Sequence, residues 1–222
     1  GLLPAAHVYP LPVPDPPLEL PEGQVPLEPI LQRVRDRGEQ WRSAIDGLRP
    51  QTQQIWLRLS PGDRDRLMTG LVRQWDIHRH RMAPPVADAM AAHIADGRIA
   101  VLAAPGFSAW LRGDTVVLDT AAGELVADRL VVCTGPQSDV TLSQLGRSLV
   151  GAGRARQGPY RIGYDVDPAS GGLIDASGHA DDRIIAMGPL RRGVLFESTA
   201  IPEISVQARD LAARILLVSS SA

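Results

Sequence analysis

The sequence contains no lysine and only one cysteine, and both scarcities limit what the protein can be. All 23 basic residues are arginine, and 25 acidic residues balance them to a net charge of −2. A balanced charge gives no overall attraction to nucleic acid or to an anionic membrane surface, so we expect neither as a partner. Cys133 has no second cysteine for an internal disulfide, which favours a reducing, cytoplasmic setting.

Long apolar runs and several catalytic motifs are missing as well. No stretch reaches the roughly 18 apolar residues that a membrane-spanning helix needs. The sequence has no Cys-x-x-Cys pair, no Walker loop and no Ser, His and Asp in the order of a hydrolytic triad. On a helix, His78 and His80 would lie about 200° apart, too far apart to share a metal ion. We therefore predict no metal site.

The residues that are present divide the chain into three segments. Residues 1–26 are rich in proline, which removes backbone donors and favours extended conformations, so they predict an irregular arm. Residues 27–97 show helical periodicity, with Gly38 as a break and Ser60 as a helix cap. An apolar stripe late in this segment predicts that Trp75 is buried.

The period changes in the third segment, residues 98–222, which predicts mixed α/β structure. Short runs of β-formers between glycine-containing turns predict strands, and amphipathic runs predict helices. The chain as a whole is therefore expected to be α+β. We expect short strands over Ile99–Ala103, Ala109–Arg112, Thr115–Asp119 and Arg129–Cys133, a buried strand over Arg183–Met187, and helices over Leu142–Val150 and Ile201–Val218.

Four segments of the chain occur in a distinctive order. They are Gly1–Pro4 with His7, Trp75–Pro84, Val132–Pro136, and Met187–Gly193 continuing to Glu197–Ile204. Together they resemble one protein family, the FAD/NAD(P)-binding proteins of bacteria, which is related in architecture to flavin-containing monooxygenases. The resemblance implies that the helical segment and the mixed α/β segment complete a two-dinucleotide-binding flavoprotein fold.

The resemblance also implies a function for a longer protein. Members of the family hold FAD with a Gly-x-Gly-x-x-Gly loop near their N-terminus and hold the nicotinamide nucleotide with a second loop. Neither loop occurs here, since Gly151-Ala152-Gly153 has only the first two glycines. We expect this chain to be the C-terminal portion of an NAD(P)H-dependent flavin oxidoreductase. Its partner would be the missing N-terminal dinucleotide-binding segment, and the chain alone would be inactive; its oligomeric state is left open.

Cofactor contacts are implied at two glycine turns and at the start of the last helix. Each turn follows an expected strand, where glycine allows the backbone to approach a ligand closely. The first amides of the last helix can donate to electron-rich flavin oxygens. Glu203, in the same helix, is expected to cap it or to pair with Arg191 or Arg192. The implied contact residues are Thr134, Gly135, Pro136, Gly188, Pro189, Leu190, Gly193, Thr199, Ala200 and Ile201.

Several alternatives remain open from the residues alone. The turn at Thr134-Gly135-Pro136 can also be a strand end closed by proline, with no ligand. Arg79 and Arg81 can contact a substrate or another anion, or can be structural. A non-catalytic module that binds a partner chain through the arm and the helices is the alternative function. Nucleic-acid binding through the arginines between Arg33 and Arg49 is disfavoured by the acidic residues between them.

Overall fold

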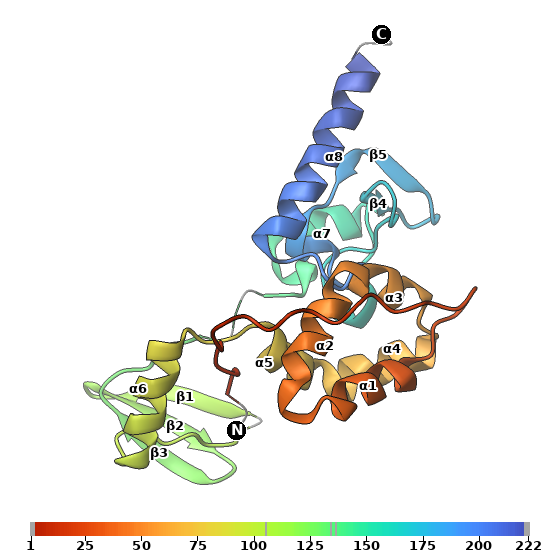
Figure 1. The fold of residues 1–222 in the computed structure, drawn as a ribbon. Coiled ribbons are helices and arrows are strands. Elements are labelled where there is room, and N and C mark those ends of the chain that lie inside the picture. The colour runs from red at the N-terminus through yellow and green to blue at the C-terminus, as the bar shows by residue number, and fades with distance from the viewer. Residues whose placement is uncertain (1–2, 105, 134, 136, 220–222) are drawn as a thin grey trace. The chain divides into compact units, whose positions relative to one another are not determined.

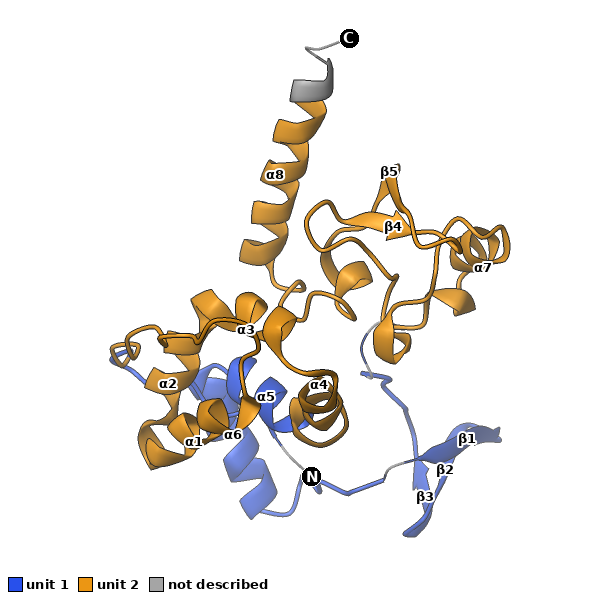
Figure 2. Ribbon diagram, turned by 90° about the vertical axis from the view of Figure 1, so that its right-hand side faces the viewer, with its two compact units in different colours: residues 1–11, 73–136 blue, residues 12–72, 137–222 orange. Residues whose placement is uncertain are grey.

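A computed structural model of the chain describes residues 3–104, 106–133, 135 and 137–219 (Figure 1). Helices and antiparallel strands both occur, which confirms the predicted α+β class. The chain divides into two compact units (Figure 2). Unit 1 contains residues 1–11 and 73–136, and unit 2 contains residues 12–72 and 137–222. The segment boundaries expected from the sequence, after residues 26 and 97, stay a prediction.

Four short helices lie at the start of unit 2, and Gly38 and Ser60 set two of their boundaries as the sequence predicts. Gly38 separates the first two, and its φ of +49° is a conformation that glycine adopts without strain. Ser60 caps the fourth, because its Oγ accepts the N–H of Asp63 at 3.1 Å. The apolar stripes, including Ile45 and Trp56, are buried. The helices are α1 (Leu27–Asp36), α2 (Trp41–Leu48), α3 (Thr52–Arg58) and α4 (Pro61–Arg66).

The proline-rich stretch from residue 12 to residue 26 lies against these helices. The buried carboxylate of Asp15 accepts two hydrogen bonds from the guanidinium of Arg37, at 2.7 and 2.9 Å. Gln51 donates to the Leu18 carbonyl and accepts from the Leu18 amide. A Cβ atom at Gly47 would lie 2.4 Å from the Asp15 carbonyl oxygen. The arm is therefore packed on its own chain, although it contains no helix or strand.

The rest of unit 2 combines short strands with two helices around a second apolar core. The first helix lies where the sequence predicts one, and Ser143 caps it by accepting the N–H of Gly146 at 2.9 Å. Tyr164, Leu173 and Ala186 are buried in the core. The elements are α7 (Gln144–Gly151), the antiparallel pair β4 (Gly172–Ile174) and β5 (Ala180–Ile185), and α8 (Ile201–Ser219), whose start the sequence predicts (Figure 1).

The predicted strand over Arg183–Met187 needs correction. A strand does occur there, but β5 begins earlier and ends at Ile185. None of its residues is fully buried, although the apolar run predicted a buried strand. The physical reason is that β5 pairs with only one short strand, β4, among the described residues.

Unit 1 is built from a three-stranded antiparallel meander, the helix α6 and most of α5. Positive φ angles at Gly113 and Gly123 close the two tight turns of the meander. Two of its strands confirm the prediction, whereas the third was missed because its glycine was assigned to a turn alone. The elements are α5 (Val72–Arg79), α6 (Pro84–Ala95), β1 (Phe107–Arg112), β2 (Thr115–Thr120) and β3 (Gly123–Ala127).

Two predicted strands in unit 1 are absent from the described residues. The segments Ile99–Ala103 and Arg129–Cys133 are extended or irregular, and no neighbouring strand takes their backbone hydrogen bonds. Val131 and Val132 are 78% and 67% exposed, and Cys133 is exposed as well. An apolar β-branched run forms a strand only where a neighbour supplies the ladder, so composition alone was an insufficient signal.

Trp75 is half-exposed, so the prediction that it is buried is wrong. The stripe that suggested burial assumed an unbroken α-helix. Instead, a π-helical turn at Leu67–Leu71 joins α4 to α5 and changes the angular spacing along the stripe. No residue of α5 is fully buried in the described structure.

The carboxylate of Asp181 stabilises the start of β5 in a pH-dependent way. It accepts hydrogen bonds from Arg154 at 2.7 Å and from the backbone amides of Arg183 and Ile184 at 2.8 and 3.0 Å. These donors, Arg154 first, lower the pKa of Asp181 from 3.8 to about 2. Because the fold favours the ionised form, this stabilisation is complete above about pH 4 and is lost as the pH falls toward 2.

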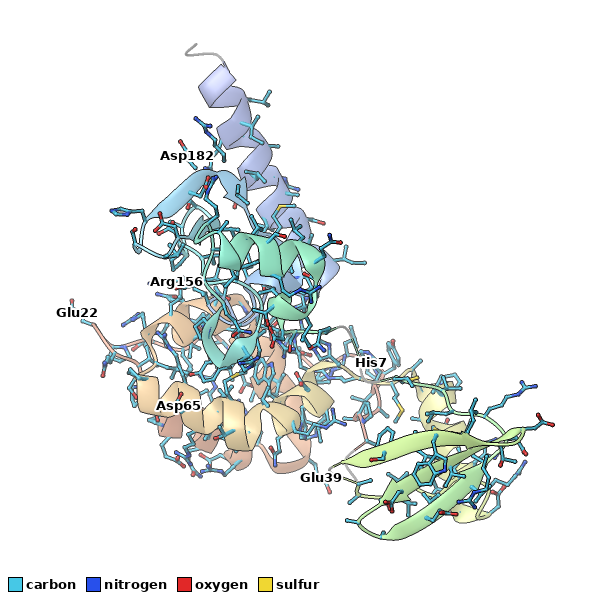
Figure 3. All side chains as sticks on the ribbon, turned by 180° about the vertical axis from the view of Figure 1, so that it is seen from behind. His7, Glu22, Glu39, Asp65, Arg156 and Asp182 are labelled. Carbon is cyan, nitrogen blue, oxygen red and sulfur yellow. The ribbon has the colours of Figure 1, made fainter. Side chains whose placement is uncertain are left out.

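We therefore expect Asp181→Asn to lower the free energy of unfolding at neutral pH and to flatten its decline between pH 4 and 2. Urea unfolding at a series of pH values measures both effects. Asp182→Asn is the matched control, because that side chain is 94% exposed beside the same strand (Figure 3). Identical pH profiles for Asp181→Asn and the unmodified chain would contradict the assignment.

Candidate functional site

Most of the implied cofactor residues fall in one continuous stretch of unit 2. It runs from Gly188, just beyond the end of β5, to Ile201, the first residue of α8. We call it the Gly188–Ile201 segment. Apart from a short 3₁₀ turn at Gly188–Arg191, it contains no regular secondary structure. Its conformation therefore depends on side chains and on backbone contacts with the rest of the unit.

Gly188 brings the end of β5 against the first turns of α8. Its φ is +62°, and its amide donates to the side-chain oxygen of Gln207 at 2.8 Å. A Cβ atom at this position would lie 3.4 Å from Ile204 Cδ1, within ordinary contact distance. Glycine is thus required here by the backbone angle more than by the available space. The strand end and the helix start do meet, and whether a flavin lies against them stays a prediction.

Gly193 allows a close backbone approach, but to the protein itself. A Cβ atom at position 193 would lie 2.4 Å from the carbonyl oxygen of Ile162 and 2.7 Å from that of Pro159. Nearby, the amide of Tyr164 donates to the carbonyl of Leu190 at 2.7 Å. The turn at Pro159–Arg161 and the residues after it therefore pack directly on the segment. A flavin contact at Gly193 stays a prediction.

Helix α3 holds the middle of the segment. The indole N–H of Trp56 donates to the Val194 carbonyl at 2.9 Å, and its ring stacks on Phe196 with centroids 5.0 Å apart. The side-chain oxygen of Gln53 accepts the amide N–H of Glu197 at 3.3 Å. The sequence gives no signal for these contacts, because they join residues more than 130 positions apart.

The start of α8 carries polar groups that the protein itself does not fully satisfy. Ser198 has no exposed area, and its hydroxyl has no hydrogen-bond partner among the described residues. Thr199 and Ala200 are half-buried, and Ile201 is 79% exposed. Glu203 pairs with Arg49 at 3.2 Å, a partner that the sequence did not indicate. That Glu203 also caps the helix or pairs with Arg191 or Arg192 stays a prediction.

Arg191 adds positive charge close to this helix. Burial lowers the pKa of its guanidinium, while the negative charge of Asp210 acts in the opposite direction. Its Nε is buried without a hydrogen-bond partner among the described residues. Because an arginine side chain remains protonated in proteins, this is a permanent and incompletely paired cation.

An apolar cavity of about 420 Å³ lies between α7 and β5. Of the implied cofactor residues in the described structure, Leu190 lines it. The amphipathic pattern around α7 was the sequence signal that could have indicated this cavity. Leu142 and Leu145 belong to that pattern, line the cavity and are largely exposed. Sequence reasoning used that pattern to predict a helix and did not identify the cavity.

The remaining implied residues lie in unit 1 or outside the described residues. Gly135 has a φ of +81° and open space around it, whereas Thr134 and Pro136 lie outside the described residues. Because Gly135 and Gly188 belong to different units, their convergence on one ligand stays a prediction.

Arg79 and Arg81 also belong to unit 1, at the end of α5 and just beyond it. Arg81 Nε donates to the His78 carbonyl at 2.7 Å, which shows a structural contact for that side chain. Nδ1 of His78 lies 2.7 Å from the Gln74 carbonyl, within hydrogen-bond distance. An anion contact by either arginine stays a prediction. Within the described ranges, no group of three potential ligands could hold a metal ion.

Two comparisons with known proteins identified no relative of this chain. A scan against models of protein families gave no match, and a search of curated proteins gave none either. No helix in the described residues combines the length and the apolar character needed to cross a bilayer. The family resemblance and the cytoplasmic setting therefore stay predictions.

The positive φ at Gly188 leads to a stability prediction. An alanine there must adopt the left-handed region, which costs an L-residue about 1–2 kcal/mol. We expect Gly188→Ala to lower the free energy of unfolding by about that amount. Gly62→Ala in α4 is the control, since Gly62 has no positive φ and open space around it. Equal denaturant midpoints for the two variants would contradict the structural role given to Gly188.

Proposed function

We propose that this chain is the C-terminal portion of an FAD- and NAD(P)H-dependent oxidoreductase. In this proposal the Gly188–Ile201 segment contributes backbone and helix N-terminus contacts to the flavin site. The observation that supports it most is the contact of Gly188 with α8. Gly188, in a left-handed conformation just beyond the end of β5, lies against the first turns of that helix. Ligands of α/β proteins commonly bind beyond the carboxyl ends of strands and at helix N-termini.

The chemistry of the residues at the start of α8 fits a flavin. The first amides of a helix carry partial positive charge, which suits the electron-rich oxygens of an isoalloxazine ring. Ile201 is the first residue of α8, and Thr199 and Ala200 lead into it. The incompletely paired Arg191, which is not fully buried, adds a donor that a polar ligand could satisfy. A bound flavin would supply the redox chemistry by accepting a hydride from reduced nicotinamide.

Exposed apolar surfaces give the proposal further support. Leu130, Val131 and Val132 follow the meander of unit 1 as an exposed run with strand-like composition. In unit 2 the cavity beside β5 is lined mainly by leucine and isoleucine. Exposed apolar surfaces of this kind are expected where another segment of a larger fold packs against them. That segment would also carry the glycine-rich loops, which this sequence lacks.

The alternative functions receive less support. The interaction module would bind its partner through the arm and the helices, and residues 12–26 of that arm are already hydrogen-bonded to helices of their own chain. The nucleic-acid alternative required unpaired arginines, and all five are paired with carboxylates. These pairs are Arg33 and Arg37 with Asp15, Arg35 with Glu28, Arg42 with Asp46, and Arg49 with Glu203.

The proposal predicts how the chain behaves toward FAD when it is produced alone. Because the dinucleotide phosphates would have to be held by loops outside it, we expect a colourless preparation that binds FAD weakly. The same residues, produced together with a segment that carries two Gly-x-Gly-x-x-Gly loops, should retain flavin in a 1:1 ratio. Visible flavin absorbance after gel filtration measures both. Stoichiometric flavin in the isolated chain would contradict the proposed division of roles.

A further inference from the structure

We propose that Trp56 is a positioning residue that fixes the Gly188–Ile201 segment, and that Gln53 adds a second hydrogen bond to the same segment. The inference rests on the proposed function, because it concerns the segment assigned there to the flavin. Both residues lie on α3, three positions apart, and therefore face the same side of that helix. Neither residue belongs to the stretches that carry the family resemblance.

Trp56 contacts the segment through two different kinds of interaction. Its indole N–H donates to the main-chain carbonyl of Val194 at 2.9 Å. Its ring stacks on Phe196, with an interplanar angle of 23°. The hydrogen bond is directional and fixes the position of the backbone at Val194. The stacking contact fixes the orientation of the Phe196 ring. One side chain, 2% exposed, thus constrains both the main chain and a side chain of the segment.

Gln53 supplies a second constraint three residues further along. Its side-chain oxygen accepts the amide N–H of Glu197 at 3.3 Å. The bonds to Val194 and Glu197 therefore bracket Leu195 and Phe196, both of which are buried. Two anchors on one helix face prevent the bracketed backbone from rotating, which a single anchor would permit.

The Pro159–Arg161 turn holds Trp56 on another side. Tyr160 meets the Trp56 ring edge-on, with centroids 6.4 Å apart, and its hydroxyl donates to Asp65 on α4 at 2.9 Å. Burial and this carboxylate raise the pKa of Tyr160 to about 12, so the hydroxyl keeps its proton at neutral pH. Tyr160 and Arg161 both have positive φ, a conformation that costs free energy in non-glycine residues. The fold therefore maintains a strained turn against Trp56.

The anchored residues lie directly before the groups assigned to the flavin. Glu197 precedes the Thr199 amide by two positions, and the residues from Arg192 to Ala200 have no strand or helix of their own to hold them. A displaced anchor would move the amides at the start of α8. Binding and redox sites lose function when such groups are about 1 Å out of place. A merely structural tryptophan would need the ring but not the indole N–H.

Trp56→Phe separates these two roles, because it keeps an aromatic ring on Phe196 and removes the N–H donor. Amide hydrogen exchange on this 222-residue chain is the first measurement. We expect exchange at Leu195, Phe196 and Glu197 to rise by about 5- to 30-fold, the effect of losing one buried hydrogen bond. Amides of α1 should be unchanged. Gln53→Met should raise exchange at Glu197, and Trp41→Phe on α2 is the matched indole control. Unchanged exchange at all three amides in Trp56→Phe would overturn the proposal.

The second measurement uses the longer flavoprotein and reads out the flavin. We expect Trp56→Phe to shift the visible absorption spectrum of the bound flavin and to weaken FAD affinity by about 5-fold or more. Trp41→Phe should change neither. Faster exchange with an unchanged spectrum and affinity would reduce Trp56 to a structural residue and overturn the proposal. If the unmodified longer protein holds no flavin, the proposed function fails while the exchange result still decides whether Trp56 positions the segment.

Discussion

The contact between Trp56 and the backbone at Val194 is the interaction on which unit 2 most depends. It joins α3 to a stretch that lies 138 positions later in the chain. The same ring lies against Phe196 and Tyr160, and Arg64 lies over its face at 5.6 Å. Aromatic side chains of this size bury large areas and satisfy one polar group, which makes them effective links between segments. The helices at the start of unit 2 therefore support the Gly188–Ile201 segment, in addition to packing against one another.

This arrangement explains why a segment with little regular structure can serve as a candidate site. Loops that carry function are usually held by a rigid scaffold, because their own backbone bonds are few. Here α3, the Pro159–Arg161 turn and Gln207 of α8 supply that scaffold. The groups at the start of α8 can then remain incompletely satisfied, as Ser198 is, without loosening the fold. An unsatisfied buried hydroxyl costs free energy, so its presence calls for a functional explanation.

The sequence predicted local structure well and long-range structure poorly, for physical reasons. Helix boundaries at Gly38, Ser60 and Ile201 follow from backbone conformation, capping and periodicity, which act within a few residues. Strands need partners, so the apolar run at Arg129–Cys133 was misassigned and β3 was missed. The π-helical turn before α5 changes the angular spacing of the apolar stripe, so the prediction that Trp75 is buried was wrong. In the candidate site the turn at Gly188 was predictable, whereas its anchors on α3 were not, because packing between distant segments has no local signature.

Amide exchange at Thr199, Ala200 and Ile201 tests the central claim most directly. The longer protein is compared with and without FAD, because those amides are the donors that the account assigns to the flavin. We expect slower exchange at these three residues when FAD is bound, with amides of α1 (Leu27–Asp36) unaffected. Equal exchange at all three in a protein that demonstrably holds FAD would contradict the claim that the start of α8 forms part of the flavin site.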